Sequence, residues 1–271
     1  MQKTVAYEGA DLAYEDVGQG PVLVLIHGFE GDATVWRYQA AFLRDRYRLI
    51  IPDLPGRGQS PFPGAITPGA RAWSLDACAD RVHAILRHEH VHHSVVIGHS
   101  MGGYVTMALV ERYPEVLSGF GLFHSTAYAD SEEKIKARRR WIAFIRDNGP
   151  GPFLKQVVPN LFAETYRAEH PGEIDSLIRR GSQFDGETLI AYYEAMIARP
   201  DRRRLLKDLP VLFIIGEKDA AVSPADSLEQ VRLPGISFMH YLEGVAHMGM
   251  WEATDEANRA LLEFAQYIYY E

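Results

Sequence analysis

The sequence predicts an α/β protein in which helices flank a mostly parallel sheet. Unbroken apolar runs of strand length, such as Val22–Ile26, are bounded by turn signals, as expected of parallel strands buried on both faces. Helix-compatible segments alternate with these runs, which is the pattern of a sheet covered by helices. Residues 127–206 differ, because they contain helical patterns and no strand-like run. They therefore predict a helical insertion.

Composition and charge narrow the class of protein. The 271 residues are 47% hydrophobic and 24% charged, which suits one sizeable core. A net charge of -8 argues against a general attraction to nucleic acid or anionic membranes. The sequence shows neither a bilayer-spanning apolar run nor the apolar core of a signal peptide. We expect a soluble, cytoplasmic monomer or homodimer acting on a small molecule without a cofactor, with its one cysteine, Cys78, buried.

Two runs of three arginines interrupt the acidic composition, at residues 138–140 and 202–204. Each run lies in a helical pattern with acidic neighbours. We interpret both as solvated helix faces.

The first half of the chain alternates strand and helix patterns. Residues 4–16 alternate polar and apolar side chains, as a half-buried edge hairpin does, and the turn at 18–21 ends this pattern. The patterns that follow predict strands at 22–26, 47–53, 95–97 and 118–124, and helices at 33–46, 74–87 and 104–112.

The second half begins with the helical insertion and then returns to the sheet. Helices are predicted at 131–147, 152–161, 172–183 and 186–198, followed by strands at 210–216 and 236–242 and a last helix at 254–267. The apolar faces of the insertion are rich in large side chains, most of which we expect to pack its core while a few line a pocket: Trp141, Phe144, Phe153, Phe162, Phe184, Tyr192, Tyr193 and Met196.

The segment Gly98-His99-Ser100-Met101-Gly102 connects a Val-rich strand pattern to a helix pattern. This is the context of a nucleophile elbow, a sharp turn that presents Ser100 at its tip. Gly98 and Gly102 would remove side chains that otherwise clash where strand and helix approach. The amide of Met101, at the N-terminus of the new helix, would point at an oxyanion on the substrate. The alternative is an ordinary glycine-rich turn.

The elbow sequence Gly-His-Ser-Met-Gly-Gly resembles that of the α/β-hydrolase superfamily. The resemblance implies the α/β-hydrolase fold, with a mostly parallel eight-stranded sheet and a helical cap inserted after the sixth strand. It divides the chain into a core domain of residues 1–126 and 207–271 and a cap of residues 127–206. It also implies a Ser, acid, His order along the chain, each at the carboxyl end of a strand.

The residues that match this order are Ser100, Asp219 and His247. Asp219 and His247 each follow a strand pattern with the spacing Gly-x-x-Asp or Gly-x-x-His. Glu217, two residues before Asp219, is the alternative acid, and the match to the family motif favours Asp219. The turn after residues 22–26 resembles the family's oxyanion turn, and this implies the amide of Phe29 as the second oxyanion donor beside that of Met101.

Other polar motifs are interpreted as structural. The loop from Asp53 to Ser60 resembles a structural loop of the superfamily, so no chemistry is assigned to it. Residues 88–93 contain four histidines, which could hold a divalent metal, but the spacing lacks a positioned helical pair. We interpret this segment as a polar connection and predict no metal. His99 and His124 are expected to shape the site.

We expect a carboxylesterase for small or medium acyl esters. Serine at the elbow argues against the related epoxide hydrolases and haloalkane dehalogenases, which use aspartate there. The alternatives are a carbon–carbon bond hydrolase or enol-lactonase of a catabolic pathway and, in another class, a ligand receptor on a hydrolase scaffold. Glu30 follows the oxyanion residue. If its carboxylate faces the pocket, it predicts discrimination against anionic acyl groups.

Overall fold

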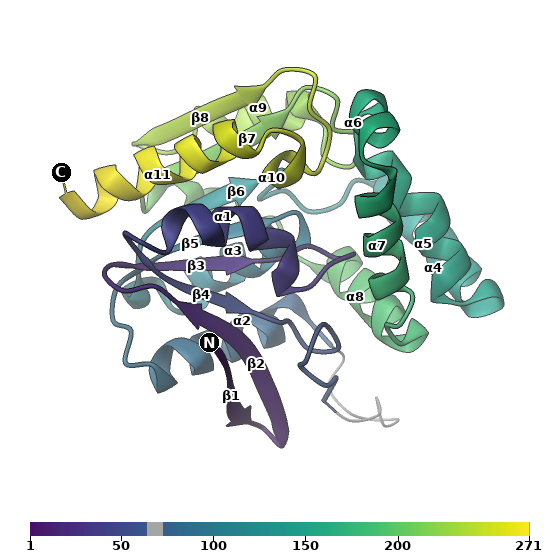
Figure 1. Cartoon of the computed structure of the whole chain (residues 1–271), viewed down its shortest axis with the longest axis horizontal. Helices are drawn as coiled ribbons and strands as arrows, with labels where there is room; N and C mark the ends of the chain where they lie inside the picture. Colours follow the sequence, from purple (N-terminus) through teal and green to yellow (C-terminus); the bar gives the residue numbers. More distant parts are fainter. Residues whose placement is uncertain (64–72, 271) are drawn as a thin grey trace.

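The computed structural model describes residues 1–63 and 73–270, which form an eight-stranded sheet with helices on both faces (Figure 1). The strand order is β1-β2-β4-β3-β5-β6-β7-β8. Strands β3 to β8 are parallel to one another, and β2 pairs antiparallel with both β1 and β4. The strands are β1 (Gln2–Tyr7), β2 (Ala10–Val17), β3 (Val22–Ile26), β4 (Arg48–Pro52), β5 (Ser94–His99), β6 (Leu117–Phe123), β7 (Val211–Gly216) and β8 (Ser237–Leu242). The predicted fold class is therefore confirmed.

The middle of the sheet explains its apolar strand sequences. Strand β5 is buried along its whole length, because it lies between β3 and β6 in the sheet and is covered by helices. Edge strands β1 and β8 instead alternate exposed and half-buried residues. The parallel arrangement brings the carboxyl ends of the central strands to one edge, and loops after these ends build the site.

Helices cover both faces of the sheet. Helices α1 (Arg37–Leu43) and α11 (Thr254–Tyr270) lie together on one face, and α2 (Leu75–His88) and α3 (Met101–Arg112) lie on the other (Figure 1). Cys78 on α2 is completely buried, as predicted, and burial raises the pKa of its thiol to about 12. This thiol is a packing residue and not a reactive one.

The chain between β6 and β7 is helical, and it covers the carboxyl ends of the strands at one side of the sheet (Figure 1). Its helices are α4 (Glu132–Asn148), α5 (Pro150–Val157), η3 (Val158–Leu161), α6 (Glu164–Glu169), α7 (Pro171–Gly181), α8 (Gly186–Ala198) and η4 (Arg203–Lys207). The predicted position of the helical insertion, after the sixth strand, agrees with this arrangement.

Several local predictions were incomplete. The segment predicted as one helix over 33–46 is a short 3-10 helix, η1 (Ala33–Trp36), followed by α1, which ends at Leu43. Helices α6, α9 (Pro224–Val231) and α10 (Gly249–Glu252) were not predicted. All three are eight residues or shorter, too short for a periodic apolar pattern to stand out.

The interpretation of the arginine runs as solvated helix faces agrees with two members of each run, Arg139 and Arg140 and Arg203 and Arg204, and was wrong for Arg138 and Arg202. The side chain of Arg138 is only 12% exposed and pairs with Asp130, and that of Arg202 is 3% exposed and pairs with Asp76 and Glu111. Each run places one member in a charged network beneath the surface, whereas Arg204 stays exposed. A local charge pattern does not reveal this, because Asp130 precedes the helix of Arg138 and the partners of Arg202 are distant in sequence.

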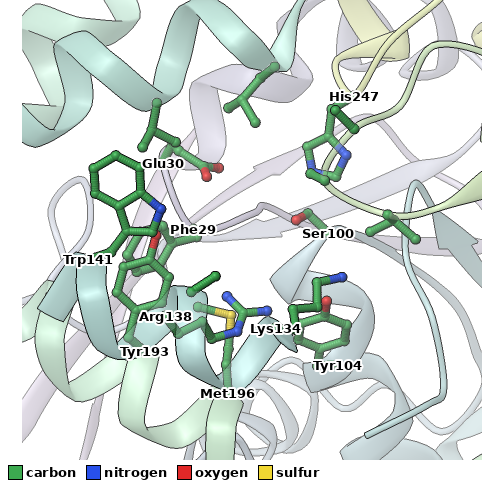
Figure 2. A pocket seen from close by; sticks show the side chains of 16 residues that line it. Phe29, Glu30, Ser100, Tyr104, Lys134, Arg138, Trp141, Tyr193, Met196 and His247 are labelled. Atoms are coloured by element: carbon green, nitrogen blue, oxygen red, sulfur yellow. The ribbon is translucent and has the colours of Figure 1, made fainter. Parts of the chain in front are cut away.

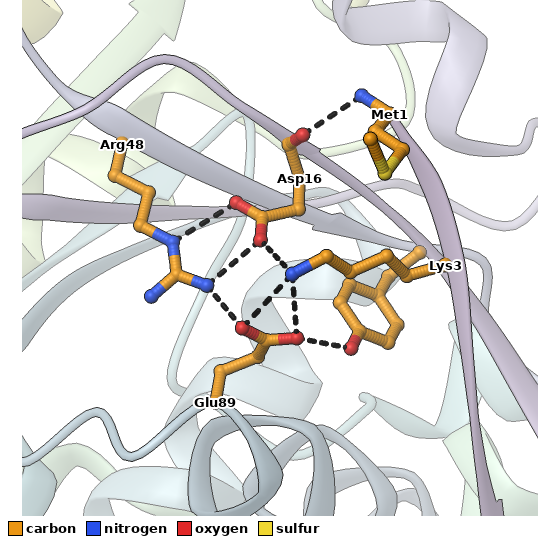
Figure 3. A network of polar contacts seen from close by, with 6 residues as sticks. Met1, Lys3, Asp16, Arg48 and Glu89 are labelled. Carbon is orange, nitrogen blue, oxygen red and sulfur yellow. Dashed lines mark hydrogen bonds and ion pairs between the residues drawn. The ribbon is translucent and has the colours of Figure 1, made fainter.

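The end of the sheet opposite the site contains a network of ion pairs (Figure 3). Asp16 accepts hydrogen bonds from Arg48 at 2.9 and 2.7 Å and from Lys3 at 2.6 Å. Glu89, at the C-terminus of α2, also pairs with both cations, and the Tyr14 hydroxyl donates to it. The network fastens β1 and β2 to β4 and α2.

The loop from Asp53 to Ser60 is held by its own polar side chains. The Asp53 carboxylate accepts from the amides of Ala33 and Gln59 at 2.9 Å each, and the Ser60 hydroxyl accepts from the amide of Ala13 at 2.8 Å. These contacts agree with the structural role expected of both residues. Separately, none of the helices in residues 1–63 and 73–270 has the length and apolar character that a membrane crossing requires.

Candidate active site

Ser100 lies in a strained turn between β5 and α3. Its backbone has φ 52° and ψ -117°, and a positive φ is rare in residues other than glycine. A side-chain carbon at Gly98 would collide with the carbonyl of Gly102, and one at Gly102 would collide with that of Ile26. The two glycines therefore permit the close approach that the turn requires, as the sequence pattern predicted.

The loop containing Phe29 lies against this turn. A side-chain carbon at Gly28 would stand 3.3 Å from Cβ of Ser100. The amide of Leu54 donates to Nε2 of His27 at 2.9 Å, so Nδ1 of the same ring carries the proton and donates to the carbonyl of Gly28 at 2.8 Å. His27 thus orients the loop next to Ser100, and both Phe29 and Ser100 line one pocket.

Asp219 and His247 are joined by a hydrogen bond between Oδ2 and Nδ1 of 2.8 Å. The other carboxylate oxygen, Oδ1, accepts from the amides of Ala221 and Val222 at 2.8 and 2.9 Å. The carboxylate is therefore fixed, and because Nδ1 of His247 is engaged, Nε2 is the ring nitrogen available to the pocket. Glu217, the alternative acid, is exposed and accepts from the amide of Gly244 at 2.8 Å instead.

Two further histidines surround this pair. His99 donates from Nε2 to the carbonyl of His247 at 2.9 Å. Nδ1 of His124 lies 3.4 Å from Oδ2 of Asp219, and its Nε2 accepts from the amide of Gly249 at 3.1 Å. Both rings are completely or almost completely buried, as expected of residues that shape the site.

The pKa shifts separate these rings into two kinds. Burial lowers the pKa of His124, and burial together with the neighbouring histidines holds that of His99 well below the usual range. Burial also opposes a charged His247, but the carboxylate of Asp219 outweighs it and raises the pKa of His247. Burial likewise opposes a charged Asp219, yet His247 and His124 hold its pKa well below the usual range. His247 is thus the basic member of the cluster.

The pocket in front of Ser100 has a volume of about 290 Å³ (Figure 2). Ser100 and His247 line it from the sheet, and the insertion contributes Trp141, Tyr193 and Met196 from the set of large side chains identified in the sequence. In the described part of the chain, the Ser100 hydroxyl makes no hydrogen bond to His247. Such hydrogen bonds commonly align only when substrate binds.

Three charged residues also line the pocket: Glu30, Lys134 and Arg138. Figure 2 shows the Glu30 carboxylate on one side of the pocket and the two basic side chains on the other. Glu30 therefore faces the pocket, the condition attached to its predicted role. The two cations were missed. Their four-residue spacing on a helix was visible, but nothing in the sequence says which face of that helix covers the site.

Hydrogen bonds join the insertion to the loop of His247. The amide of His247 donates to the carbonyl of Leu161 at 2.8 Å. The carboxylate of Glu252 accepts from the amides of Ala163, at 2.8 Å, and Met248, at 2.9 Å, so it joins the insertion to the same loop. The position of His247 thus depends on the insertion.

The histidine-rich segment at residues 88–93 lies on the connection from α2 to β5, away from the pocket. Within residues 1–63 and 73–270, no group of three or more His, Cys, Asp or Glu side chains is arranged to hold a metal ion. The interpretation of this segment as a polar connection remains a prediction.

Comparison with known proteins gives the family. Residues 21–141 match the model of the alpha/beta hydrolase fold. The pimeloyl-[acyl-carrier protein] methyl ester esterase of Aeromonas hydrophila subsp. hydrophila is 30% identical over 226 residues, which span 79% of this chain and 83% of that protein. The chain belongs to the α/β-hydrolase family.

Other α/β-hydrolases extend the likeness. The 3-oxoadipate enol-lactonase 2 of Acinetobacter baylyi is 26% identical over 83% of this chain and 82% of its own length. A thermophilic esterase from Thermogutta terrifontis, whose structure was solved with malate bound, superposes with a TM-score of 0.88 at 29% identity over 99% of both chains. Esterases and lactonases are thus among the hydrolases that this chain resembles along most of its length.

Proposed function

We propose that this α/β-hydrolase is a serine carboxylesterase acting on esters of small or medium acyl groups. The observation that carries the proposal is the 2.8 Å hydrogen bond between Asp219 and His247 beside a pocket that also contains Ser100 on a strained turn. A serine hydroxyl is a poor nucleophile at neutral pH and requires such an oriented base.

The proposed reaction has two steps. Oγ of Ser100 attacks the ester carbonyl carbon while Nε2 of His247 takes its proton, and the amides of Phe29 and Met101 stabilise the oxyanion. The imidazolium then protonates the alcohol oxygen, which leaves an acyl group on Ser100. Water attacks this acyl-enzyme, gives a proton to His247 and releases the carboxylic acid, and the proton returns to Oγ. Asp219 keeps the tautomer correct and stabilises the imidazolium.

The pocket supports the proposed substrate size. Its volume, about 290 Å³, lies just below the usual range for ligand pockets, about 300–1,000 Å³. We propose that residues 127–206 act as a cap, because α4 and α8 supply much of the pocket wall. Wall residues from the cap would limit the length of the acyl chain.

The test is hydrolysis of p-nitrophenyl esters from acetate to decanoate by the wild type and by Ser100→Ala. We expect kcat/KM to peak at a short chain length and the variant to lose essentially all activity. Labelling of the wild type by a fluorophosphonate probe, absent in the variant, gives a readout of the assembled nucleophile that needs no ester turnover. Labelling without hydrolysis of any ester would contradict the esterase proposal and leave the carbon–carbon hydrolase, enol-lactonase and ligand-receptor alternatives.

A second candidate is enol-lactone hydrolysis. The 26% identity to an enol-lactonase over 83% of this chain favours it. The chemistry at Ser100 would be the same, because a lactone is a cyclic ester whose leaving oxygen stays on the product. A panel of lactones assayed beside the linear esters separates the candidates: a lactone with kcat/KM more than tenfold above the best linear ester would identify a lactonase.

A further inference from the structure

The basic residues of the pocket lie on one helix. Lys134 and Arg138 are four residues apart on α4, so their side chains lie on the same face, and both line the pocket with Ser100 and His247 (Figure 2). A catalytic mechanism based on Ser100, His247 and Asp219 gives neither cation a task. Their presence beside the reacting groups therefore points to recognition of the substrate.

The cations outnumber the anions around them. The side chain of Asp130 is completely buried and accepts from Nε of Arg138 at 2.6 Å, but Arg199 shares the same carboxylate at 2.8 Å. One carboxylate thus faces two guanidinium groups. The hydrogen bonds to Asp130 occupy only part of the five N–H groups of Arg138. Among the described residues, Lys134 makes no ion pair at all.

Glu30 does not cancel this excess. Its carboxyl lies across the pocket from the two cations, and burial raises its pKa, which favours the neutral form. The sequence alone showed Glu30 and not the cations, and therefore predicted discrimination against anionic acyl groups. With Lys134 and Arg138 included, the charge balance of the pocket is reversed.

Building on the esterase proposal, we propose that the natural substrate carries a carboxylate a few bonds from its ester carbonyl. Lys134 and Arg138 bind this carboxylate while the ester carbonyl lies at Ser100. A guanidinium and an ammonium are suited to this task, because charge-assisted hydrogen bonds to a carboxylate are strong in a partly desolvated pocket. The substrate class is therefore a monoester of a small dicarboxylic acid, and not a simple fatty acid ester.

A matched pair of substrates tests this. Methyl valerate and monomethyl glutarate have five-carbon acyl chains and the same leaving group, and they differ in a terminal carboxylate. We expect kcat/KM to be at least about tenfold higher for monomethyl glutarate, the size of one charge-assisted hydrogen bond. Because the interaction is ionic, the ratio should fall as NaCl is raised.

Three variants locate the effect. Lys134→Met and Arg138→Met should each lower the ratio of the two kcat/KM values about tenfold. Lys136→Met is the matched control, since Lys136 lies on the same helix with its side chain 71% exposed, outside the pocket, and should keep the wild-type ratio. If Arg138→Met fails to fold, Lys134→Met decides alone, because Lys134 supports no ion pair among the described residues.

A ratio near one in the wild type, or an unchanged ratio in Lys134→Met, overturns the proposal. Lys134 also borders a second pocket that contains Asp226 and Glu229, and an unchanged ratio would mean that its charge is directed there. Hydrolysis of methyl valerate with no preference would leave the esterase function intact.

Binding to Ser100→Ala separates the two proposals when no ester is hydrolysed. Calorimetric titration with monomethyl glutarate and with methyl valerate needs no turnover. Tighter binding of the former by about tenfold, reduced in the double variant Ser100→Ala/Lys134→Met, would support the carboxylate subsite even if the esterase proposal failed. Equal binding would overturn the subsite.

Discussion

Two polar clusters lie at opposite ends of the parallel strands, and they use charge in different ways. In the ion-pair network (Lys3, Tyr14, Asp16, Arg48 and Glu89), two carboxylates face two cations, and the four charged side chains remain partly exposed. In the histidine cluster (His99, His124, Asp219 and His247), one carboxylate contacts two rings, those of His124 and His247, and the ring of His99 packs beside both. The side chains of Asp219 and His247 are 2% and 1% exposed.

The two clusters differ in whether their positive and negative charges are equal in number. Matched charges near solvent satisfy one another and connect strands, so the network contributes to stability. In the buried cluster, the carboxylate of Asp219 raises the pKa of His247, whereas the pKa values of His99 and His124 are lowered. His247 is therefore the most basic ring of the cluster. Changes in the two clusters should therefore affect different measurements.

The largest effect is expected for Asp219→Asn. An amide would favour the wrong tautomer of His247 and could not stabilise the imidazolium, so kcat should fall by about 10³–10⁴-fold while the variant stays folded. Glu217→Gln is the control, because this nearby carboxylate is exposed and bonded to Gly244. Steady-state kinetics on the best p-nitrophenyl ester measures both. A comparable loss in the control would assign the acid to Glu217.

Arg48→Met tests the other cluster. It leaves Asp16 and Glu89, whose side chains are 9% and 11% exposed, with Lys3 as their only cation in the network. We expect the free energy of unfolding to fall by about 2–3 kcal/mol, with kcat/KM within about twofold of wild type. Urea denaturation followed by fluorescence gives the first value. A fall in kcat/KM well beyond twofold in the folded variant would show that the two ends of the sheet are coupled.

The acid limb of the pH–rate profile is a finer test of the histidine cluster. His247 acts as a base only when neutral, and Asp219 raises its pKa above the ordinary value of about 6.5. Activity should thus be lost as pH falls, with the half-maximal kcat/KM of the free enzyme above pH 6.5. In Asp219→Asn the residual activity should persist to lower pH. An unshifted limb would contradict the proposed pairing.

The smallest effect is expected for acid unfolding. The hydrogen bonds from Arg48 lower the pKa of Asp16 from 3.8 to about 2, despite partial burial. The carboxylate therefore contributes stability that is fully present above pH 3.8 and is lost as pH falls through about 2. This corresponds to at most about 2 kcal/mol. Asp16→Asn should flatten that part of the stability profile, measured by denaturation between pH 5 and pH 2.

The sequence predicted the residues whose roles depend on local backbone geometry. Ser100, Gly98 and Gly102 form one contiguous turn, so their motif carries its own structure. The order and spacing of Asp219 and His247 after their strands were enough to predict that the two residues lie together, because the parallel sheet brings those strand ends together. The contact between Asp219 and His247 agrees with that reasoning.

Other features depended on packing between distant segments. Arg138 was interpreted as solvated because its partner, Asp130, and the pocket both lie outside its local pattern. The role of Glu30 was predicted from one charge, although the pocket contains three. Helix periodicity identifies an apolar face, but it does not tell which polar residues at the margin of that face enter a cavity.

The hydrogen bond from the amide of His247 to the carbonyl of Leu161 has a practical consequence. That amide proton can exchange with deuterium only when the insertion separates from the loop that holds His247. Its exchange rate therefore reports how often this hydrogen bond opens, without any substrate or label. A compound that fills the pocket and holds the insertion closed would slow this one amide, so ligands can be found before the reaction is known.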